Sequence, residues 1–187
     1  MDTITAFAAK VCDELKETVL AVSEEQARQF YERILSHRER QIFVCGAGRC
    51  QYMLRAFCMR LMHLGFRAHV AGDTATPAVE PGDLVVIADG AGYLTTIAET
   101  ARLAKGHGAE IVMLCILPDS LIGQLADYHV VIPGRTAAHG GVGHSIQPGG
   151  GKFEQSLLIL LDSVIAALVE ALGLPFDAAF ERHANLE

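Results

Sequence analysis

The sequence predicts a three-layer, doubly wound α/β fold with a five-stranded parallel sheet and two N-terminal helices. Short apolar runs typical of strands recur along the chain, and segments with helical periodicity separate them. Of the 187 residues, 51% are hydrophobic and only 20% are charged, which supports one buried core and excludes a disordered chain. Strands that alternate with helices require crossovers, so the strands run parallel and helices cover both faces of the sheet.

Two helices are expected before the first strand. Apolar residues recur at helical spacing as far as Val22, which predicts an amphipathic first helix. Ser23 followed three residues later by Gln26 matches a capping box, so a second helix is expected through about His37. The N-terminal helices are therefore assigned to residues 3–37.

The rest of the chain is predicted to alternate strands and helices. The predicted strands are 41–45, 67–71, 83–88, 110–115 and 128–132. The predicted helices are 49–64, 93–106, 120–126 and 152–173. The sheet core is assigned to 41–133, the C-terminal helices to 152–183, and the whole chain, 1–187, to one domain.

The charge and hydropathy of the chain exclude two classes of partner. Fifteen Lys and Arg against 22 Asp and Glu give a net charge of −7, which repels a nucleic-acid backbone. The mean hydropathy is high at +0.29, but the most apolar stretch, 156–174, carries Asp162 and Glu170, which disfavour a membrane span. The N-terminus has no basic segment followed by an apolar run. We therefore expect a cytoplasmic chain.

The cysteines and histidines suggest neither disulfides nor a metal centre. Five cysteines without a C-x-x-C pair are typical of reduced thiols. His139 and His144 lie in a glycine-rich segment without matched acidic or thiolate partners, so no metal is expected. The excess of apolar residues favours subunit interfaces and hence a homo-oligomer.

Glycine-rich turns follow two of the predicted strands, where ligands bind in doubly wound folds. The first turn is 46–51 and the second is 89–94, with a third glycine-rich segment, 134–151, before the last helix. Three interpretations of the first turn stay open. It could be a dinucleotide fingerprint, which Gln51 disfavours because a small residue is needed there, a tight turn without ligand, or a sugar-phosphate site.

Several motifs resemble those of a known family. They are Gly46-Ala47-Gly48-Arg49, residues 59–65, residues 145–148 with the Phe-Glu-Gln motif at 153–155, and the terminal Arg-His-Ala-Asn-Leu-Glu at 182–187. On these residues the whole chain resembles the SIS (sugar isomerase) domain family, and within it the 6-phospho-3-hexuloisomerases. The resemblance implies a flavodoxin-like SIS domain that forms homotetramers. It also implies interconversion of 3-hexulose 6-phosphate and fructose 6-phosphate without metal or nucleotide cofactor.

Two residues would carry the chemistry that this resemblance implies. Passage through an enediol needs a carboxylate that removes and returns a proton at carbon, and Glu154 matches the family's proposed proton acceptor. In the alternative interpretation, Glu154 is an exposed acidic residue in the first turn of a helix, where it complements the helix dipole. By resemblance the tail of one chain reaches a neighbouring pocket, where His183 could move protons. Otherwise, His183 is a solvated surface residue.

The predicted substrate-binding residues lie in the two turns and before the last helix. They are Gly48, Arg49, Cys50, Asp89, Gly90, Ala91, Gly92, Tyr93, Leu94 and Gln147. The family pattern in the second turn is Ser-Gly-Ser-Gly-Glu-Thr, whose hydroxyls and N–H groups hold a phosphate. Here both serines and the threonine are replaced, and Asp89 adds a negative charge. An alternative function is therefore a retuned or non-catalytic SIS module that binds a carbohydrate derivative or acts as a regulatory partner.

Cys50 follows Arg49 at the start of a predicted helix. A thiol in that position is expected to have a lowered pKa and some nucleophilic or redox-sensitive character. The alternative is a small side chain that fills the wall of the pocket.

Overall fold

The computed structural model describes residues 3–136, 139–141, 143–175 and 182–186. Its helices and strands are, in chain order, α1 (Ile4–Leu20), α2 (Glu24–Ser36), β1 (Gln41–Gly46), α3 (Gly48–His63), β2 (Arg67–Val70), β3 (Leu84–Ala88), α4 (Thr95–Gly106), β4 (Glu110–Cys115), η1 (Gly123–Leu125), β5 (Tyr128–Val131), β6 (Arg135–Thr136), β7 (Gly140–Gly141) and α5 (Gly151–Ala171).

The first two helices begin at side-chain caps. The Thr3 hydroxyl accepts a hydrogen bond from the Ala6 N–H, and the Ser23 hydroxyl accepts one from the Gln26 N–H. Gln26 does not close the predicted capping box, because its Oε1 accepts a hydrogen bond from the N–H of Val131 on β5. This side chain therefore ties α2 to the edge of the sheet.

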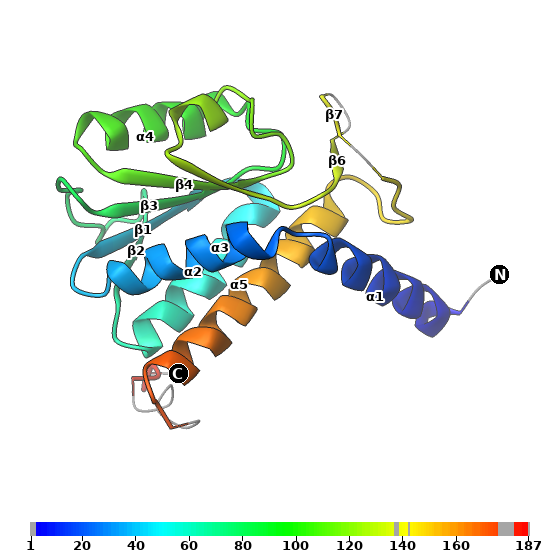
Figure 1. Ribbon diagram of the computed structural model, residues 1–187, viewed down its shortest axis with the longest axis horizontal. Coiled ribbons are helices and arrows are strands. Elements are labelled where there is room, and N and C mark those ends of the chain that lie inside the picture. The colour runs from blue at the N-terminus through cyan, green and yellow to red at the C-terminus, as the bar shows by residue number, and fades with distance from the viewer. Residues whose placement is uncertain (1–2, 137–138, 142, 176–181, 187) are drawn as a thin grey trace.

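The five long strands form one parallel sheet, which confirms the predicted fold class. The strand order is β2-β1-β3-β4-β5, with β1 and β3 adjacent inside the sheet. Figure 1 shows α4 on one face of the sheet and α2, α3 and α5 on the other. The two outward moves from β1, toward β2 and toward β3, make the doubly wound arrangement whose ligands bind at the carboxyl ends of the strands.

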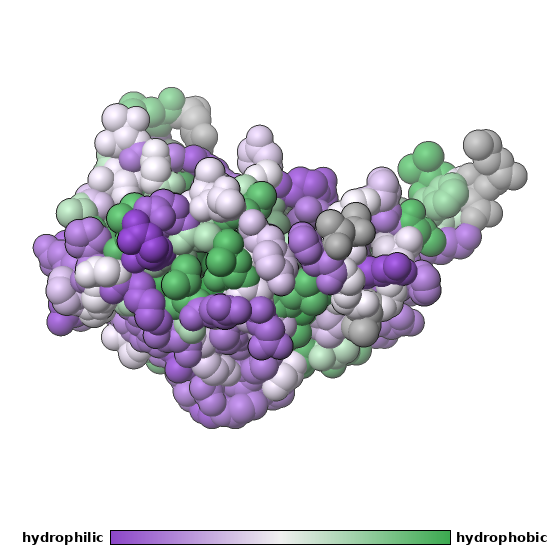
Figure 2. Space-filling view, turned by 90° about the horizontal axis from the view of Figure 1, so that it is seen from above, coloured by the Kyte–Doolittle hydropathy of each residue, from purple (hydrophilic) through white to green (hydrophobic). Residues whose placement is uncertain are grey.

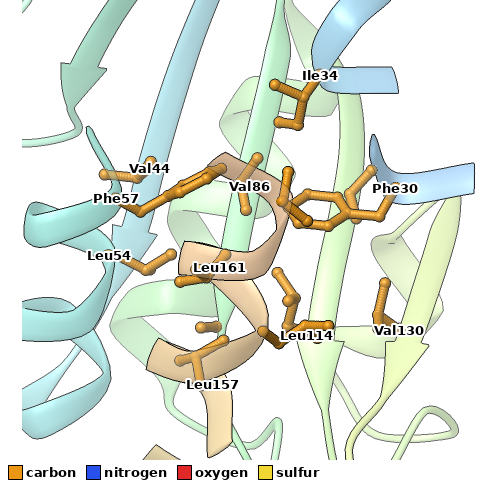
Figure 3. Close-up of a cluster of buried hydrophobic side chains, with 14 of the residues drawn as sticks. Phe30, Ile34, Val44, Leu54, Phe57, Val86, Leu114, Val130, Leu157 and Leu161 are labelled. Atoms are coloured by element: carbon orange, nitrogen blue, oxygen red, sulfur yellow. The ribbon is translucent and has the colours of Figure 1, made fainter. Parts of the chain in front are cut away.

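Each face of the sheet has its own apolar core. On the α4 face, Ile97 and Ala101 pack against sheet residues that include Val85 and Ile111. On the other face, side chains from α2, α3 and α5 cover the sheet, as Figure 3 shows. The labelled members of that cluster are Phe30, Ile34, Val44, Leu54, Phe57, Val86, Leu114, Val130, Leu157 and Leu161. Two packed faces hold the carboxyl ends of the strands in fixed register.

Residues 120–126 differ from the prediction, because they form only the short 3₁₀ helix η1 instead of an α-helix. The N–H of Ile122 donates to the carbonyl of Gly92, and the Ser120 hydroxyl accepts from the N–H of Gly123. A Cβ on Gly123 would lie 1.8 Å from the carbonyl oxygen of Pro118. These bonds join the segment to the β3–α4 loop, so its backbone is not available for a regular helix.

At the chain ends, the structure describes less helix than the sequence predicted. Helix α5 ends at Ala171, residues 176–181 of the predicted C-terminal helices 152–183 lie outside the described residues, and 182–186 are not helical.

The N-terminal part of α1 projects from the body, and Figure 2 shows apolar surface at that end, where Ile4 and Phe7 are exposed. No described helix combines the length and hydropathy needed to cross a bilayer.

Candidate functional site

Three chain segments meet at the carboxyl edge of the sheet. Gly46 ends β1 opposite Ala88 at the end of β3, so the turns that follow these two strands lie side by side. The start of α5 joins them, because a Cβ on Gly90 would lie 3.3 Å from the ring of Phe153. Residues far apart in the sequence thus form one site in the position that this fold class reserves for ligands.

Glu154 points into this meeting point from the first turn of α5. Its Oε2 accepts a hydrogen bond from Arg49 Nε at 2.8 Å, and its side chain is only 14% exposed. Its Oε1 lies 3.0 Å from the position that a Cβ on Gly150 would take, so glycine at 150 leaves room for the carboxylate. Among the described residues, no donor bonds Oε1. One carboxylate oxygen is therefore anchored and the other can accept a proton.

Arg49 anchors the carboxylate from the β1–α3 turn. It follows Gly48, whose positive φ of 53° places the turn in the left-handed region that glycine favours. The Arg49 side chain is 57% exposed, so it reaches the carboxylate from the solvent side. A guanidinium beside both Glu154 and open solvent can also contact an oxygen of a bound sugar.

Asp89 occupies the β3–α4 loop with its own carboxylate. Asp89 is 8% exposed, its Oδ1 accepts from the N–H of Ala91 at 3.1 Å, and its Oδ2 accepts from the N–H of Leu94 at 3.4 Å. Leu94 is the capping position of α4 and makes no side-chain cap. An internal anion therefore lies just before the N-terminus of α4, where it accepts one N–H of the loop and the N–H of the capping residue and would repel an external anion.

The remaining residues of this loop are held in place from two sides. Gly92 has a φ of 73°, and a Cβ there would lie 1.9 Å from the Ser120 hydroxyl, so only glycine fits. The ring of Tyr93 stacks on His139, with centroids 4.3 Å apart and an interplanar angle of 25°. The loop from Asp89 to Leu94 is thus closely packed.

The structure corrects the predicted reactivity of Cys50. Burial raises the pKa of the Cys50 thiol to about 12, and the nearby carboxylates of Glu154 and Asp89 contribute to that rise. The Arg49 guanidinium donates to Glu154. Cys50 lies among the site segments as a neutral thiol, as the alternative interpretation of a pocket-wall residue expects.

Gln147 lies beside a cavity of about 240 Å³ next to the start of α5. The cavity is lined by Gly134, Arg135, Thr136, Gly143, His144, Ser145, Gln147, Gly149, Gly150, Lys152 and Phe153. Figure 1 shows β6 and β7 beside the start of α5, where this cavity lies. The buried Nε2 of Gln147 has no hydrogen-bond partner among the described residues. Phe153 borders both this cavity and Gly90, so the cavity adjoins the β3–α4 loop.

Comparison with known proteins identifies the family. The model of the SIS domain matches residues 34–146. The chain belongs to the SIS domain family. It is 41% identical over 184 residues to the 3-hexulose-6-phosphate isomerase of Bacillus subtilis strain 168, covering 98% of each chain. It is 38% identical over 186 residues to the 3-hexulose-6-phosphate isomerase of Mycobacterium gastri, covering all of this chain and 92% of that one.

Solved structures agree with this assignment to the SIS domain family. A crystal structure of a hypothetical protein superposes with a TM-score of 0.86 at 30% identity, covering 98% of this chain and 97% of that one. A hypothetical protein from Methanococcus jannaschii, for which 3-hexulose-6-phosphate isomerase was inferred, superposes with a TM-score of 0.81 at 28% identity. That match covers 96% of this chain and 98% of the other.

In this SIS domain His183 lies far from Glu154 of the same chain. The His183 ring lies 5.2 Å from the ring of His63, at the end of α3, and Arg182 Nη1 donates to the His63 carbonyl. Glu154 lies at the beginning of α3, beside Arg49. Fifteen residues at 1.5 Å each separate the two ends of α3 by about 22 Å. The two predicted catalytic residues are therefore not brought together within one chain.

Sequence reasoning missed two residues of this SIS domain, Arg135 and Lys152. A signal for them was present: the chain has 22 acidic residues, yet none lies between 134 and 153. Neither Arg135 nor Lys152 forms an ion pair with any described carboxylate, and Lys152 Nζ donates to the His144 carbonyl at 3.3 Å. Within the described ranges, no group of three or more His, Cys, Asp or Glu residues is arranged to hold a metal.

Proposed function

We propose that this SIS domain is a ketose-phosphate isomerase that interconverts 3-hexulose 6-phosphate and fructose 6-phosphate. The observation that carries the proposal is the shielded Glu154 carboxylate, anchored by Arg49 at the carboxyl edge of the sheet. The names of the Bacillus subtilis and Mycobacterium gastri relatives, at 41% and 38% identity, support the same substrate pair.

The reaction moves a carbonyl between neighbouring carbons without net oxidation. From 3-hexulose 6-phosphate, Glu154 removes the proton at C2, and the electron pair forms the C2–C3 double bond of an enediol. The carbonyl oxygen O3 gains a proton as the enediol forms. The hydroxyl proton on O2 then leaves, the C2 carbonyl forms, and the protonated Glu154 returns a proton to C3. A single carboxylate can serve both carbons because they are adjacent and it retains one unbonded oxygen.

The proposal places His183 in the site of a second copy of the chain. Within one chain His183 lies beside His63, at the opposite end of α3 from Glu154, so His183 would reach this site only from another copy. Its chemical task would be to move the proton between O2 and O3. The resemblance implies a homotetramer, and the exposed apolar side chains of Ile4, Phe7 and Leu20 on α1 support an interface between copies. A cytoplasmic location and a single domain over 1–187 belong to the same proposal.

A second candidate function is favoured by Asp89. Because its carboxylate occupies two N–H groups of the β3–α4 loop, the chain would serve as a retuned or non-catalytic module for a carbohydrate derivative. In that case the presence of Asp89, where the family pattern has serine, would abolish the binding of phosphate and not move it to another place in the site.

Exchange of carbon-bound hydrogen separates these functions. The purified protein is incubated with fructose 6-phosphate in deuterated water, and deuterium at C3 is followed by NMR or mass spectrometry. We expect exchange by the native protein and a loss of about 100- to 10,000-fold for Glu154→Gln, the range typical of a general base. The control is Glu99→Gln, which removes an exposed carboxylate paired with Arg102 on α4 and should leave exchange unchanged. No exchange by concentrated native protein, or equal exchange by Glu154→Gln, would exclude the isomerase.

A further inference from the structure

Helices α3, α4 and α5 begin at the carboxyl edge of the sheet, and the loop before α4 differs from the start of α5 in carrying a buried carboxylate that accepts N–H groups of the loop. This Asp89 carboxylate accepts from Ala91 and Leu94. The first N–H groups of α4 itself, those of residues 95–97, donate to no other described group. At α5 the capping position is Gly150, which provides no side-chain hydrogen bond. The first N–H groups of a helix have no partner inside the helix. In the part of the chain that the structure describes, those of residues 151–153 donate to no other group.

A dianion would meet opposite electrostatics at these two places. In the β3–α4 loop it would approach the Asp89 carboxylate, which is buried and bonded to two N–H groups of the loop. Removing two loop N–H groups from that carboxylate would also leave it buried and unbonded, which is costly. A phosphate therefore cannot bind at this loop without displacing its internal anion.

The cavity beside α5 has the opposite character. Arg135, on β6, and Lys152, on α5, both line it. No described acidic residue lines it, and neither cation is paired with a described carboxylate. The buried Gln147 Nε2 is an N–H donor that lacks an acceptor among the described residues. A buried donor without a partner is unusual in a folded protein, so this N–H group is available to a bound acceptor.

The cavity also has suitable size and position. Its volume of about 240 Å³ is below the roughly 300–1,000 Å³ of pockets for whole small molecules, so it suits one end of a substrate. Gly150 lines the cavity, and a Cβ there would lie 3.0 Å from Glu154 Oε1. A sugar whose phosphate lies in the cavity can thus extend its carbon chain toward the catalytic carboxylate.

We propose that this chain holds the phosphate of its substrate in the cavity beside the start of α5, with Arg135 and Lys152 as its cationic ligands and Gln147 as a neutral donor. This placement deepens the proposed function and rests on it, because it says where that substrate's phosphate binds. The β3–α4 loop then serves as a scaffold whose anion site is filled by Asp89.

The test uses the double variant Arg135→Met and Lys152→Met, which keeps an unbranched apolar stem and removes both charges. The matched control is Arg28→Met with Arg102→Met, which changes the net charge equally at exposed helix positions. Two readouts are taken from the full chain: calorimetric titration with inorganic phosphate, and KM and kcat for fructose 6-phosphate. Both cavity side chains are at least partly exposed, so the double variant is expected to fold, and a thermal melt checks this.

For each cation removed we expect phosphate affinity to fall by about 10- to 100-fold, with KM rising in proportion and kcat changing little. The control pair should match the native protein in both readouts. Native protein that fails to bind phosphate at millimolar concentrations, or a double variant with native affinity and native KM, would overturn the placement.

The outcomes for placement and function can be told apart. Isomerisation with an unchanged KM in the double variant rejects the cavity as the phosphate site and leaves the isomerase standing. Phosphate binding that depends on Arg135 and Lys152, in a protein that exchanges no hydrogen on fructose 6-phosphate, supports the site and rejects the isomerase.

Discussion

The two crossover segments that enter α4 and α5 begin at the same edge of one sheet but are built in opposite ways. The segment before α4 closes on itself: Asp89 bonds its N–H groups, and Ser120 fills the space beside Gly92. The segment before α5 is open: a Cβ on Gly149 would meet no described atom within 4 Å, and Arg135 and Lys152 have no described carboxylate partner. Two loops at the same ligand edge therefore differ in their affinity for an anion, because a buried carboxylate already accepts N–H groups in one of them.

The largest expected effect comes from reopening the closed segment. Asp89→Ser, Ala91→Ser and Leu94→Thr restore hydroxyls at the positions where the SIS pattern has them and remove the internal anion. Added to the Arg135→Met and Lys152→Met variant, they are expected to recover about 100-fold or more in sugar-phosphate affinity, since each hydrogen bond to a charged group contributes roughly 1.5–3 kcal/mol. Calorimetry with fructose 6-phosphate measures this.

The triple substitution in the otherwise native chain is the control for that experiment. It should tighten sugar-phosphate binding, because a second suitable site is created. No gain in either background would mean that the loop geometry, and not Asp89, prevents phosphate from binding there.

The next effect concerns packing in the two segments. Gly92→Ala places a Cβ 1.9 Å from the Ser120 hydroxyl at a φ of 73°, so we expect a loss of about 2–5 kcal/mol in the free energy of unfolding. Gly149→Ala, at a φ of 65° with open space around it, should cost only about 1–2 kcal/mol. Urea denaturation compares the two variants.

Adding Ser120→Gly to Gly92→Ala removes the clashing atoms and should recover part of the loss. Equal destabilisation by the two alanines would show that the segments do not differ in packing.

The smallest expected effect is a change in the pKa of Cys50, which depends in part on the charges of Glu154 and Asp89. Because burial and these carboxylates raise the thiol pKa to about 12, alkylation at neutral pH should be slow at Cys50 and faster at the exposed Cys12. Glu154→Gln and Asp89→Asn should each lower the pH at which Cys50 becomes reactive. Mass spectrometry of iodoacetamide labelling over a pH series measures both.

The same shift gives the sign of a stability change at alkaline pH. An unfolded chain ionises this thiol near its ordinary pKa of 9.0, whereas the folded chain keeps the proton until about pH 12. The contribution of Cys50 to stability is therefore complete below pH 9 and is lost as the pH rises toward 12. A flat stability profile over that window would contradict the buried, neutral thiol.

Much of the fold could be predicted because its signals are local. The strand pattern from Gln41 onward and the cap at Ser23 depend on residues close in sequence, and both correspond to observed elements. The segment 120–126 was predicted incorrectly because the N–H of Ile122 bonds to Gly92, about thirty positions earlier, which no local periodicity reveals.

The residues of the site could be predicted from the sequence, but their hydrogen bonds and their ionisation could not. Resemblance pointed to Glu154 and Arg49, and the structure joins them across 105 positions. The pKa of Cys50 had the wrong predicted direction, since burial raises it most and the carboxylates that add to the rise lie 39 and 104 positions away. Asp89 was expected to add a negative charge to the loop, whereas its bonds to the second and fifth following residues depend on the path of the turn and were not predicted.

The position of residues 182–186 at the far end of α3 has a consequence for assemblies that mix two defective variants of the chain. If each chain lends its His183 to a neighbour, every site is a product of two polypeptides, and neither inactive Glu154 chains nor inactive His183 chains can work alone. Co-assembled, the two defective chains would rebuild a proportion of intact sites, so a heterozygous pair of lesions would complement each other. Because α3 holds the two proposed catalytic groups of one chain apart, the assembly and not the single polypeptide would be the active unit.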